Sequence, residues 1–472
     1  MTRRRFHPVR SMSTPSTMQK ENSHIMRIRA TVPGTRSRRA AGAALIAAIG
    51  LAASACAGGG STGTTTSSSA SPLPSVTGPV TITFQEVYGT KTQLATITKI
   101  VDAFEKQNPN ITVNLEASSN YTALFEKENA EVTAGNTPTI GMGYEANAQT
   151  WSTAQKILPI KNLAGSNSPA EYSTFYTGVQ KDLKLSDGNI WMWPLGKSLQ
   201  VQAVNKTMLS AAGITAAPTT WDEWATDLET VTAKEKATNS KFAGITVYPM
   251  GTGETLLEEL AATYGEQLYA ADGTPQFTSA DAVKALTFLQ TEKTKGALAV
   301  GGSTTDLYPG EDALTGGSAA VDLTSSAGVY YESVPKGDTL EFDPLPGDSE
   351  MYGANLVVFS SATTQQQAAA WQLLQYLASP SVQATWSEGI GYYPVTSQAL
   401  TSMDASYLAK NPWIQQTIGN LNTAFTDPPF GWVTDCEINL ENAVSSALSG
   451  TSASSALQTA QSACAAKKSA ES

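Results

Sequence analysis

Residues 80–143 alternate between strand and helix patterns, and this alternation constrains the fold more than any other feature of the chain. Apolar residues recur in three short segments, which predicts strands at 80–84, 111–115 and 139–143. The two segments between them have helical spacing and end at Asn108-Pro109 and at Gly135-Asn136. Consecutive strand–helix–strand units produce parallel strands with right-handed crossovers. We therefore expect an α/β fold built around a parallel sheet.

The first 79 residues have the pattern of an export signal and a tether. Basic residues end at Arg39, and the uncharged apolar stretch 40–55 is too short for a comfortable membrane span. Its end, LAASAC, resembles a bacterial lipobox, so we expect residues 1–55 to be removed as a lipoprotein signal peptide and Cys56 to be lipidated. An ordinary secretory signal with a chance cysteine is the alternative. Residues 56–79 are nearly all Gly, Ser, Thr, Ala and Pro, which predicts a flexible tether at the outer face of the membrane.

The chain after residue 55 is strongly acidic and lacks two residue types. It holds 20 lysines against 40 aspartates and glutamates, a net charge of −20, and no arginine or histidine. Such a body is repelled by nucleic acid, so we expect no nucleic-acid partner. The missing histidine excludes a Ser-His-Asp triad and a His-ligated zinc site, and the missing arginine excludes a bidentate grip on phosphate. We expect neither a metal nor an organic cofactor.

Length and cysteine content limit how the chain after residue 55 can be organised. Its 417 residues are too many for one compact core and suit two domains. Apart from Cys56 it contains only Cys436 and Cys464, and an even pair in an exported protein predicts a disulfide. Two free thiols are the alternative. The residues after this pair, 466–472, have the pattern of a disordered tail.

Polar and aromatic residues follow the carboxyl ends of the predicted strands. Glu86 and Tyr88 follow the first strand, Tyr121 follows the second, and Glu145 follows the third. Ligands of open α/β sheets bind outside these strand ends. Aromatic rings offer apolar faces to C–H groups, and carboxylates accept hydrogen bonds from hydroxyls, so the set favours a polyhydroxylated ligand. Each residue taken singly has the alternative of being an ordinary loop residue.

Several segments, taken in order, resemble the extracellular sugar-binding proteins of ABC importers. Residues 187–194 and 218–224 resemble the midsection of that family, and 316–321 resembles its G-x-x-A-M strand and turn. The most specific match is GANLVVF at 353–359 followed by GYYPV at 391–395. This series is similar to the branch that binds glycerol-3-phosphate and glycerophosphodiesters. The resemblance extends over about residues 80–465.

The resemblance implies a fold of the type II periplasmic-binding-protein class, with two α/β lobes, a hinge and a central ligand cleft. Lobe 1 would hold 80–196 plus 353–398, and lobe 2 would hold 197–352 plus 399–465. Closure of the cleft on a small-molecule sugar would be read by ABC permease subunits in the membrane. The resemblance implies a monomer that performs no catalysis.

The resemblance also implies ligand contacts. Carried over position by position, they fall on Tyr121, Glu145, Ser198, Ser325, Gly353 and Tyr392. The strand ends independently select the first two, and they add Glu86. The branch binds phosphate with an arginine in a late helix, but here that region reads DCEIN and ends in Asn439, which we include as a candidate contact.

Loss of that arginine favours a sugar or oligosaccharide over a glycerophosphate as the ligand. Lys197, beside Ser198, could supply a cation, but lysine is a point charge without the guanidinium fork. A glycerophosphodiester binder is the alternative. An exported carbohydrate-active enzyme, which needs only two carboxylates, and a lipoprotein scaffold are two further classes.

Overall fold

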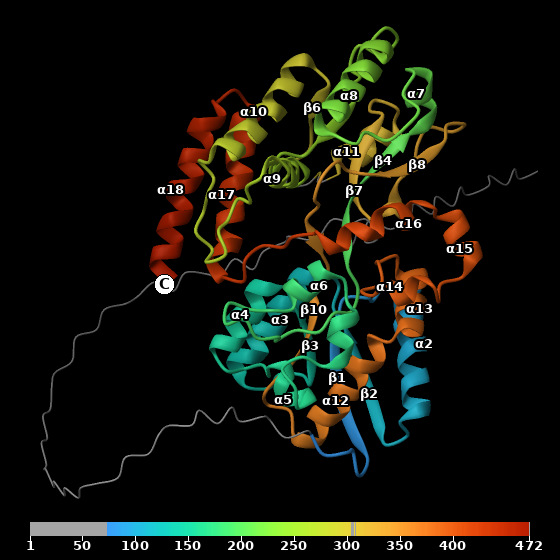
Figure 1. Ribbon diagram of the computed structural model, residues 1–472, viewed down its shortest axis with the longest axis vertical. Helices are drawn as coiled ribbons and strands as arrows, with labels where there is room; N and C mark the ends of the chain where they lie inside the picture. Colours follow the sequence, from blue (N-terminus) through green and yellow to red (C-terminus); the bar gives the residue numbers. More distant parts are fainter. Residues whose placement is uncertain (1–72, 304–305, 307, 472) are drawn as a thin grey trace, which may run out of the picture.

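The computed structural model describes residues 73–303, 306 and 308–471. It has two lobes, each with a central β-sheet and helices on its outside (Figure 1). The expected α/β architecture with two lobes is confirmed. The predictions of a signal peptide, of a lipidated Cys56 and of a tether up to residue 72 concern residues outside the described ranges.

The sheet of lobe 1 contains the three strands predicted at the start of the chain. Its order is β10-β3-β1-β2. The strands are β1 (Val80–Glu86), β2 (Ile111–Ala117), β3 (Ile140–Gly143) and β10 (Asn355–Val358). Strand β1 pairs in parallel with β2 and with β3, as the strand–helix alternation predicts, and β10 joins the edge of β3 antiparallel. The parallel arrangement brings the ends of β1, β2 and β3 to the same edge.

Two helices connect these strands, and their ends follow local signals. Helix α2 (Lys91–Gln107) ends before Pro109, and α3 (Tyr121–Ala134) ends at Gly135, which has φ 75°. The side chain of Asn120 caps the start of α3 by accepting a hydrogen bond from the amide of Ala123. Tyr121 is therefore held at the first helical position, at the carboxyl edge of the sheet.

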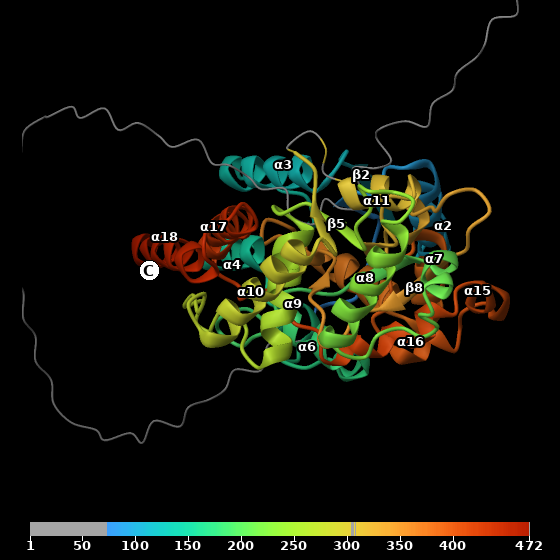
Figure 2. The same cartoon turned by 90° about the horizontal axis from the view of Figure 1, so that it is seen from above.

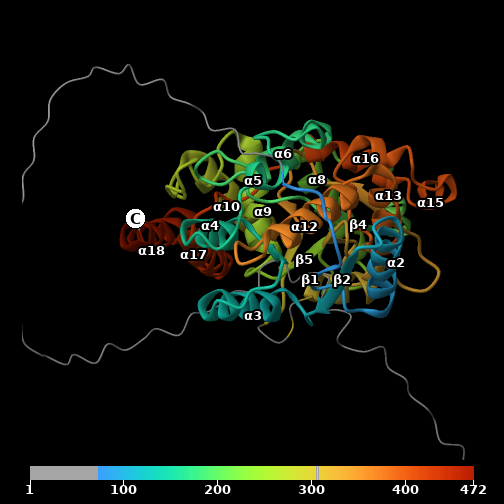
Figure 3. The same cartoon turned by 90° about the horizontal axis from the view of Figure 1, so that it is seen from below.

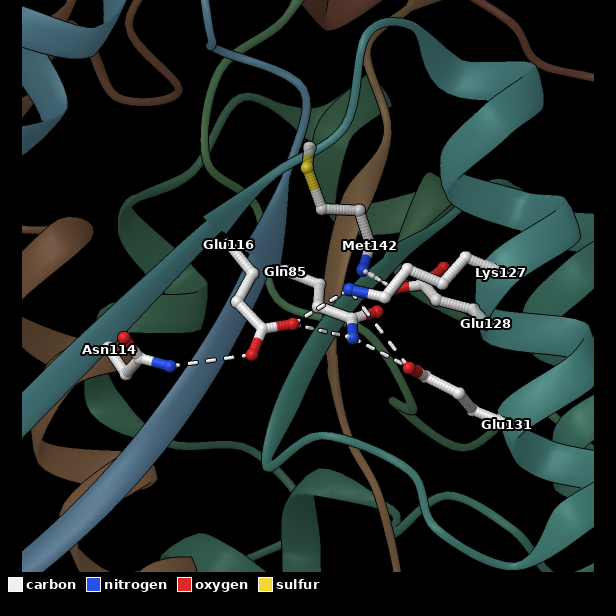
Figure 4. Close-up of polar contacts among 7 residues, drawn as sticks. All are labelled: Gln85, Asn114, Glu116, Lys127, Glu128, Glu131 and Met142. Atoms are coloured by element: carbon white, nitrogen blue, oxygen red, sulfur yellow. Dashed lines mark hydrogen bonds and ion pairs between the residues drawn. The ribbon is translucent and has the colours of Figure 1, made fainter.

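A buried carboxyl group fastens α3 to the sheet (Figure 4). Oε1 of Glu128 accepts a hydrogen bond of 2.9 Å from the amide of Met142 on β3. Burial raises the pKa of Glu128 well above its usual range. Nearby, Nε2 of Gln85 donates to Glu131 at 2.9 Å and to Glu116 at 3.2 Å. These contacts fix α3, and with it Tyr121, relative to β1, β2 and β3.

The remaining layers of lobe 1 come from two distant parts of the chain. Shorter helices follow β3, namely α4 (Glu145–Thr153), α5 (Ile160–Ala164) and α6 (Thr177–Asp182). After β10 come α12 (Thr364–Leu377), whose start is a capping box at Thr363, and α13 (Pro380–Ile390), which begins with proline. Helices α12 and α2 flank the sheet in Figure 1, and α13 packs against α2.

Lobe 2 has a mixed sheet of order β6-β5-β7-β4-β8, with β9 paired to β4. Its strands are β4 (Ser198–Asn205), β5 (Ile245–Val247), β6 (Leu298–Val300), β7 (Val321–Ser325), β8 (Leu340–Pro344) and β9 (Met351–Tyr352). The main helices are α7 (Lys206–Ala211), α8 (Trp221–Glu235), α9 (Thr252–Tyr264), α10 (Ala280–Lys295), α11 (Pro309–Thr315), α17 (Gly431–Leu448) and α18 (Ala453–Glu471). Strand β5 runs parallel to β6 and β7, whereas β4 runs antiparallel to β7 and β8.

Each lobe has its own hydrophobic core. Phe84, Trp193 and Trp386 lie in the first core, and Trp224 and Phe242 lie in the second. All five side chains are almost completely buried. Two separate cores of this size are expected for a chain too long to fold around one.

The segment after α13 lies between the lobes. It contains α14 (Ser397–Leu400), α15 (Ala405–Lys410) and α16 (Trp413–Thr417). Ile414 and Leu421 belong to the first core, while the ring of Trp413 also lies 5.7 Å from that of Phe342 on β8. Sequence resemblance assigned these residues to lobe 2, but much of their apolar surface is buried against lobe 1. The residue-level division of the chain between lobes stays a prediction.

Three passages of the chain join the lobes, and they are hydrogen-bonded to one another. Strand β9 pairs antiparallel with the start of β4, so that Ser198 lies opposite Tyr352. The amide of Met351 donates a bond of 2.8 Å to the carbonyl oxygen of Phe425 on the third passage. At the second passage Gly353 has φ 111°, and a Cβ there would lie 2.5 Å from the carbonyl oxygen of Gly196. Only glycine fits that crossing without strain.

The carboxyl-terminal hairpin of helices confirms one prediction and corrects another. Cys436 on α17 and Cys464 on α18 form the predicted disulfide. The expectation of a disordered tail is wrong for residues 466–471, because α18 continues to Glu471. Lys467 pairs with Asp435 at 2.5 Å, and Lys468 pairs with Asp272 at 3.1 Å. The disulfide and these contacts hold an alanine-rich segment in its helix.

The last residues of the expected tether are also docked rather than free. Leu73 and Val76 pack against the first core. The amide of Thr77 donates a hydrogen bond of 3.0 Å to Oε1 of Gln365 on α12. The tether prediction is therefore wrong for residues 73–79, which have two apolar side chains to bury. In the described part of the chain, no helix is both long enough and apolar enough to cross a membrane.

Candidate functional site

A cavity of about 330 Å³ lies between the lobes. The chain passages that join the lobes form the hinge. The walls of the cavity come from α3 and α4 of lobe 1, from strand β9 at the hinge, and from the loop before α17 and the first turns of α17 in lobe 2. Figures 2 and 3, which view the molecule from opposite sides, both show α17 beside α4. The lining residues with large or charged side chains are Tyr121, Phe125, Tyr144, Glu145, Glu350, Met351, Tyr352, Asp427, Asp435, Glu437 and Glu471.

Two residues predicted from strand ends meet in this cavity. Tyr121 is the first residue of α3, and Glu145 is the first residue of α4. Because β2 and β3 both run parallel to β1, the helices that follow them start at the same sheet edge. A carboxylate at the first turn of α4 also lies at the positive end of the helix dipole.

Tyrosine rings form one side of the site. The ring of Tyr121 lies 5.6 Å from that of Tyr144, and its hydroxyl lies 3.4 Å from the hydroxyl of Tyr392. Tyr88 touches Tyr392 edge-on at 6.3 Å. Burial raises the pKa of Tyr121 and that of Tyr392 well above 10, so both hydroxyls keep their protons and can donate hydrogen bonds. Tyr121 lines the cavity, whereas Tyr392 does not and contacts Tyr121 from behind the wall.

Glu86 lies beneath the tyrosines, away from the cavity wall. Its carboxylate is completely buried and accepts a hydrogen bond from the amide of Tyr88. Burial raises the pKa of Glu86 to about 7, and the bond from Tyr88 opposes that rise. The structure therefore supports a positioning role for Glu86 in the turn that carries Tyr88.

The raised pKa of Glu86 predicts a pH dependence of stability. A carboxyl whose folded-state pKa exceeds the unfolded value of 4.5 contributes stability that is present below pH 4.5 and is lost as pH rises through 7. The loss approaches about 3 kcal/mol at 1.36 kcal/mol per pKa unit. Because part of the loss occurs below pH 5, Glu86→Gln should reduce the difference between the free energies of unfolding at pH 5 and pH 8 by about 2.5 kcal/mol. Urea titrations of both proteins test this, and identical pH profiles would contradict it.

Four other predicted contacts are not among the residues lining this cavity. Ser198 is buried at the start of β4, and Ser325 is buried at the end of β7, where its Oγ accepts a hydrogen bond of 3.2 Å from the amide of Ala327. Gly353 belongs to the hinge. Asn439 donates a bond of 2.9 Å to the carbonyl oxygen of Asp435 within α17. The first three lie in or next to the chain passages between the lobes.

Lys197, which the sequence suggested as a possible cation for the ligand, forms a buried ion pair instead. Nζ of Lys197 lies 2.6 Å from Oδ2 of Asp182 and donates to the carbonyl oxygen of Gly353, also at 2.6 Å. Asn355 donates to the same Asp182 oxygen at 2.9 Å. Burial opposes ionisation of Asp182, but the charge of Lys197 and these bonds lower the pKa of Asp182. Lys197 thus joins the hinge to lobe 1.

Glu145 stands at the edge of this charged group. Burial and then the negative charge of Asp182 raise the pKa of Glu145 well above its usual range, while Lys197 opposes that rise. Glu145 also lines a second cavity of about 320 Å³, which contains Asp182 and Lys181 and lies on the other side of residues 426–428. The carboxyl of Glu145 therefore faces both cavities between the lobes.

Sequence reasoning missed the residues contributed by the hinge and by the start of α17. Tyr352 donates a hydrogen bond of 2.6 Å to Glu350, and both line the cavity. Tyr352 directly precedes the GANLVVF motif, so its position was accessible from the sequence. Asp182 had no such signal, because its partner Lys197 is recognised only once α6 and the hinge are folded.

Comparison with known proteins places this geometry in a family. Residues 99–415 match the model of the family described as bacterial extracellular solute-binding protein. The chain belongs to that family, and the resemblance inferred from its motifs is confirmed. The sn-glycerol-3-phosphate-binding periplasmic protein UgpB of Salmonella typhimurium is 25% identical over 337 residues, which cover 67% of this chain and 75% of that protein.

Solved structures share the fold. MalE, a sugar-binding protein from Xanthomonas citri, superposes with a TM-score of 0.72 at 20% identity, over 83% of this chain and 98% of its own. UgpB from Mycobacterium tuberculosis, solved in complex with glycerophosphocholine, superposes with a TM-score of 0.69 at 18% identity, over 84% and 99%. At these identities the comparison shows that the two-lobed architecture is shared.

Proposed function

We propose that this protein is the substrate-binding component of an ABC importer, and that it binds a sugar or oligosaccharide between its lobes and delivers it unaltered to a membrane permease. The observation that carries the proposal is the cavity itself. It combines Tyr121 and Glu145 of lobe 1 with hinge and α17 residues, so a ligand there contacts both lobes. Binding that bridges two hinged lobes favours the closed form.

The ligand contacts follow from position in the site. Tyr121 and Tyr144 supply ring faces for sugar C–H groups, and Glu145 accepts hydrogen bonds from sugar hydroxyls. Tyr392 supports Tyr121, and Glu86 supports the turn at Tyr88. The remaining candidates do not line the cavity and would act indirectly. Ser198, Ser325 and Gly353 would do so through the chain passages between the lobes, and Asn439 through its hydrogen bond to Asp435 in α17.

A glycerophosphodiester is the second candidate, favoured by the UgpB relatives. The chain's own residues favour it less. No lysine is among the described residues that line the first cavity, and Lys197 is neutralised by Asp182. A phosphate there would have no cationic partner, and an unpaired charge is costly to desolvate.

The proposal includes an extracytoplasmic location. Lipidation at Cys56 would anchor a monomer at the extracellular face of the cell membrane through its tether. The acidic charge of the body fits a protein held clear of anionic lipid. Mass spectrometry of the protein purified from membranes, with a diacylated amino-terminal Cys56 expected, tests the anchor. An unmodified terminus would contradict it.

A thermal-shift screen of sugars, oligosaccharides and glycerophosphodiesters tests the binding function. At 100 times its Kd a true ligand adds about 2.7 kcal/mol to the free energy of unfolding, which visibly raises the Tm. Mass spectrometry after overnight incubation should recover the ligand unchanged. Turnover would favour a carbohydrate-active enzyme instead, and no stabilising compound in the panel would favour a scaffold.

Tyr121→Ala should weaken binding of the compound found in that screen by an order of magnitude or more, because one ring face of the site is lost. Tyr264→Ala is the matched control. Tyr264 stacks against Lys284 at 3.5 Å and lines neither cavity described above. Calorimetric titration gives both affinities. Equal affinities in the two variants would place the ligand elsewhere.

A further inference from the structure

We propose that the solute carries a protonated amine, and that its ammonium group binds beside Glu145 in the cavity between the lobes. An amino sugar or an aminocyclitol-containing oligosaccharide has this chemistry. The inference rests on the proposed function, since it names the class of solute that the same cavity takes. It follows from the charge of the walls, from a pair of facing carboxyl groups, and from the rings beside them.

The cavity walls carry charge of one sign. Six acidic residues line it, and the described lining includes no lysine. They are Glu145, Glu350, Asp427, Asp435, Glu437 and Glu471. Asp435 is balanced by Lys467 at 2.5 Å, outside the lining, and Glu350 accepts the hydroxyl of Tyr352. A concave site lined by one sign of charge concentrates solutes of the opposite sign.

A second observation concerns Glu145, which lines this cavity, and Asp182, which lines the second cavity on the other side of residues 426–428. The carboxyl groups of Glu145 and Asp182 face each other within hydrogen-bonding reach. Asp182 is 2% exposed, and its Oδ1 receives no hydrogen bond from the described residues while both carboxyls are ionised. Two facing carboxylates need a proton or a cation between or beside them. Lys197 and Asn355 both bind Oδ2, so Oδ1 and the carboxyl group of Glu145 are left for the solute.

The aromatic residues beside Glu145 suit the same group. Tyr121 and Tyr144 lie with their ring centroids 5.6 Å apart, and Phe125 touches both, at 5.7 Å from Tyr121 and 5.6 Å from Tyr144. Ring faces attract ammonium groups, and the attraction grows where water is excluded. The same faces pack against the C–H surface of a sugar ring. A carboxylate and aromatic faces together recognise an amine on a carbohydrate better than either does alone.

Other cations fit these walls less well. Among the described residues, no three carboxylate, cysteine or histidine side chains are grouped so that they could hold a metal ion. An amine on a larger solute uses one carboxylate and several rings, which is what this wall provides. An anionic solute would meet six acidic side chains, and the described lining offers it no lysine.

Matched amine and N-acetyl compounds test the proposal. The probes are glucosamine, its β-1,4-linked dimer and its trimer, each compared with the N-acetylated form of the same length. We expect at least one amine to bind tenfold or more tightly than its N-acetyl partner in calorimetric titration. Its affinity should fall several-fold between 50 and 500 mM NaCl, because salt screens charge pairs, while that of the N-acetyl form should hold.

Variants locate the effect. Glu145→Gln should weaken binding of the amine at least tenfold and that of the N-acetyl partner by a clearly smaller factor, because glutamine keeps a carbonyl oxygen that accepts hydrogen bonds from hydroxyls but loses the negative charge. Glu126→Gln, an exposed residue of α3 outside the cavity lining, is the matched control and should change neither. Should Glu145→Gln fail to fold, Asp435→Asn on the opposite wall serves instead, with an expected threefold loss for the amine alone.

The outcomes separate the two proposals. Three results would each overturn the amine inference. The N-acetyl compounds bind as tightly as the amines, the amines fail to bind, or Glu145→Gln leaves the affinity for the amine unchanged. Solute binding would still stand if any neutral sugar or glycerophosphodiester of the wider panel binds. Failure of every compound in both panels would overturn the proposed function as well.

Discussion

Lys197→Met is expected to lower the free energy of unfolding by about 3–5 kcal/mol, because it removes one partner of a buried ion pair. Lys197 is 1% exposed and Asp182 is 2% exposed, so water cannot replace the lost ammonium group. The substitution leaves Asp182 buried beside Glu145, with a hydrogen bond from Asn355 but without the cation that balances its charge. Methionine keeps the length of the side chain, so lost packing contributes little. Urea denaturation at pH 7 measures the change.

Two further variants give this prediction its control. The double variant Lys197→Met with Asp182→Asn removes both charges and should recover most of the lost stability. Lys127→Met removes an ion pair of similar length, 2.7 Å to Glu116, but both of its side chains are 39% exposed. That change should cost less than about 1 kcal/mol. A Lys197→Met variant as stable as Lys127→Met would show that the buried pair contributes little.

Replacing Cys436 and Cys464 by serine is expected to lower the free energy of unfolding by about 3–4 kcal/mol. In the chain-entropy model a disulfide stabilises by restricting the unfolded chain, and this one closes a loop of 28 residues. Both cysteines are completely buried in the second core, where serine hydroxyls add a further cost. Chemical denaturation of the oxidised wild type and of the double variant gives the difference.

The control for the disulfide is the wild-type protein after reduction. It should unfold close to the midpoint of the double serine variant, since each lacks the same covalent restraint. Helix α18 should then become the first region to exchange its amide hydrogens. A loss below about 1 kcal/mol in both proteins would contradict the account, because α17 and α18 would then hold together through packing alone.

The parts of the fold that could be predicted are those with local signals. The strands β1, β2 and β3 follow from apolar periodicity, and Gly135 and Pro109 mark helix ends. Because parallel strands end at one edge, Tyr121 and Glu145 could be placed near one another without any structure. Tyr121 and Glu145 meet in a cavity because of this topology, and no local sequence motif links the two residues.

The parts that could not be predicted depend on contacts between distant segments. The Lys197–Asp182 pair joins a hinge residue to α6, and no sequence pattern around either residue predicts it. The tail expected to be disordered is helical because Cys464 and Lys467 tie it to α17, whose position was unknown. The motif-derived contacts Ser198, Ser325 and Gly353 lie in or next to the chain passages between the lobes and do not line the cavity, which no sequence pattern indicated. Their role as ligand contacts stays a prediction.

The most direct test of the central claim, a solute bound between two hinged lobes, is hydrogen exchange of the full-length protein with and without a compound that raises its Tm. We expect slower exchange in peptides from both sides of the cavity, around 121–128 and 145–150 of lobe 1 and around 431–437 of α17. Peptides from α12, which lines neither cavity, should be unchanged. Protection confined to one lobe, or lying away from the Tyr121–Glu145 wall, would contradict the account.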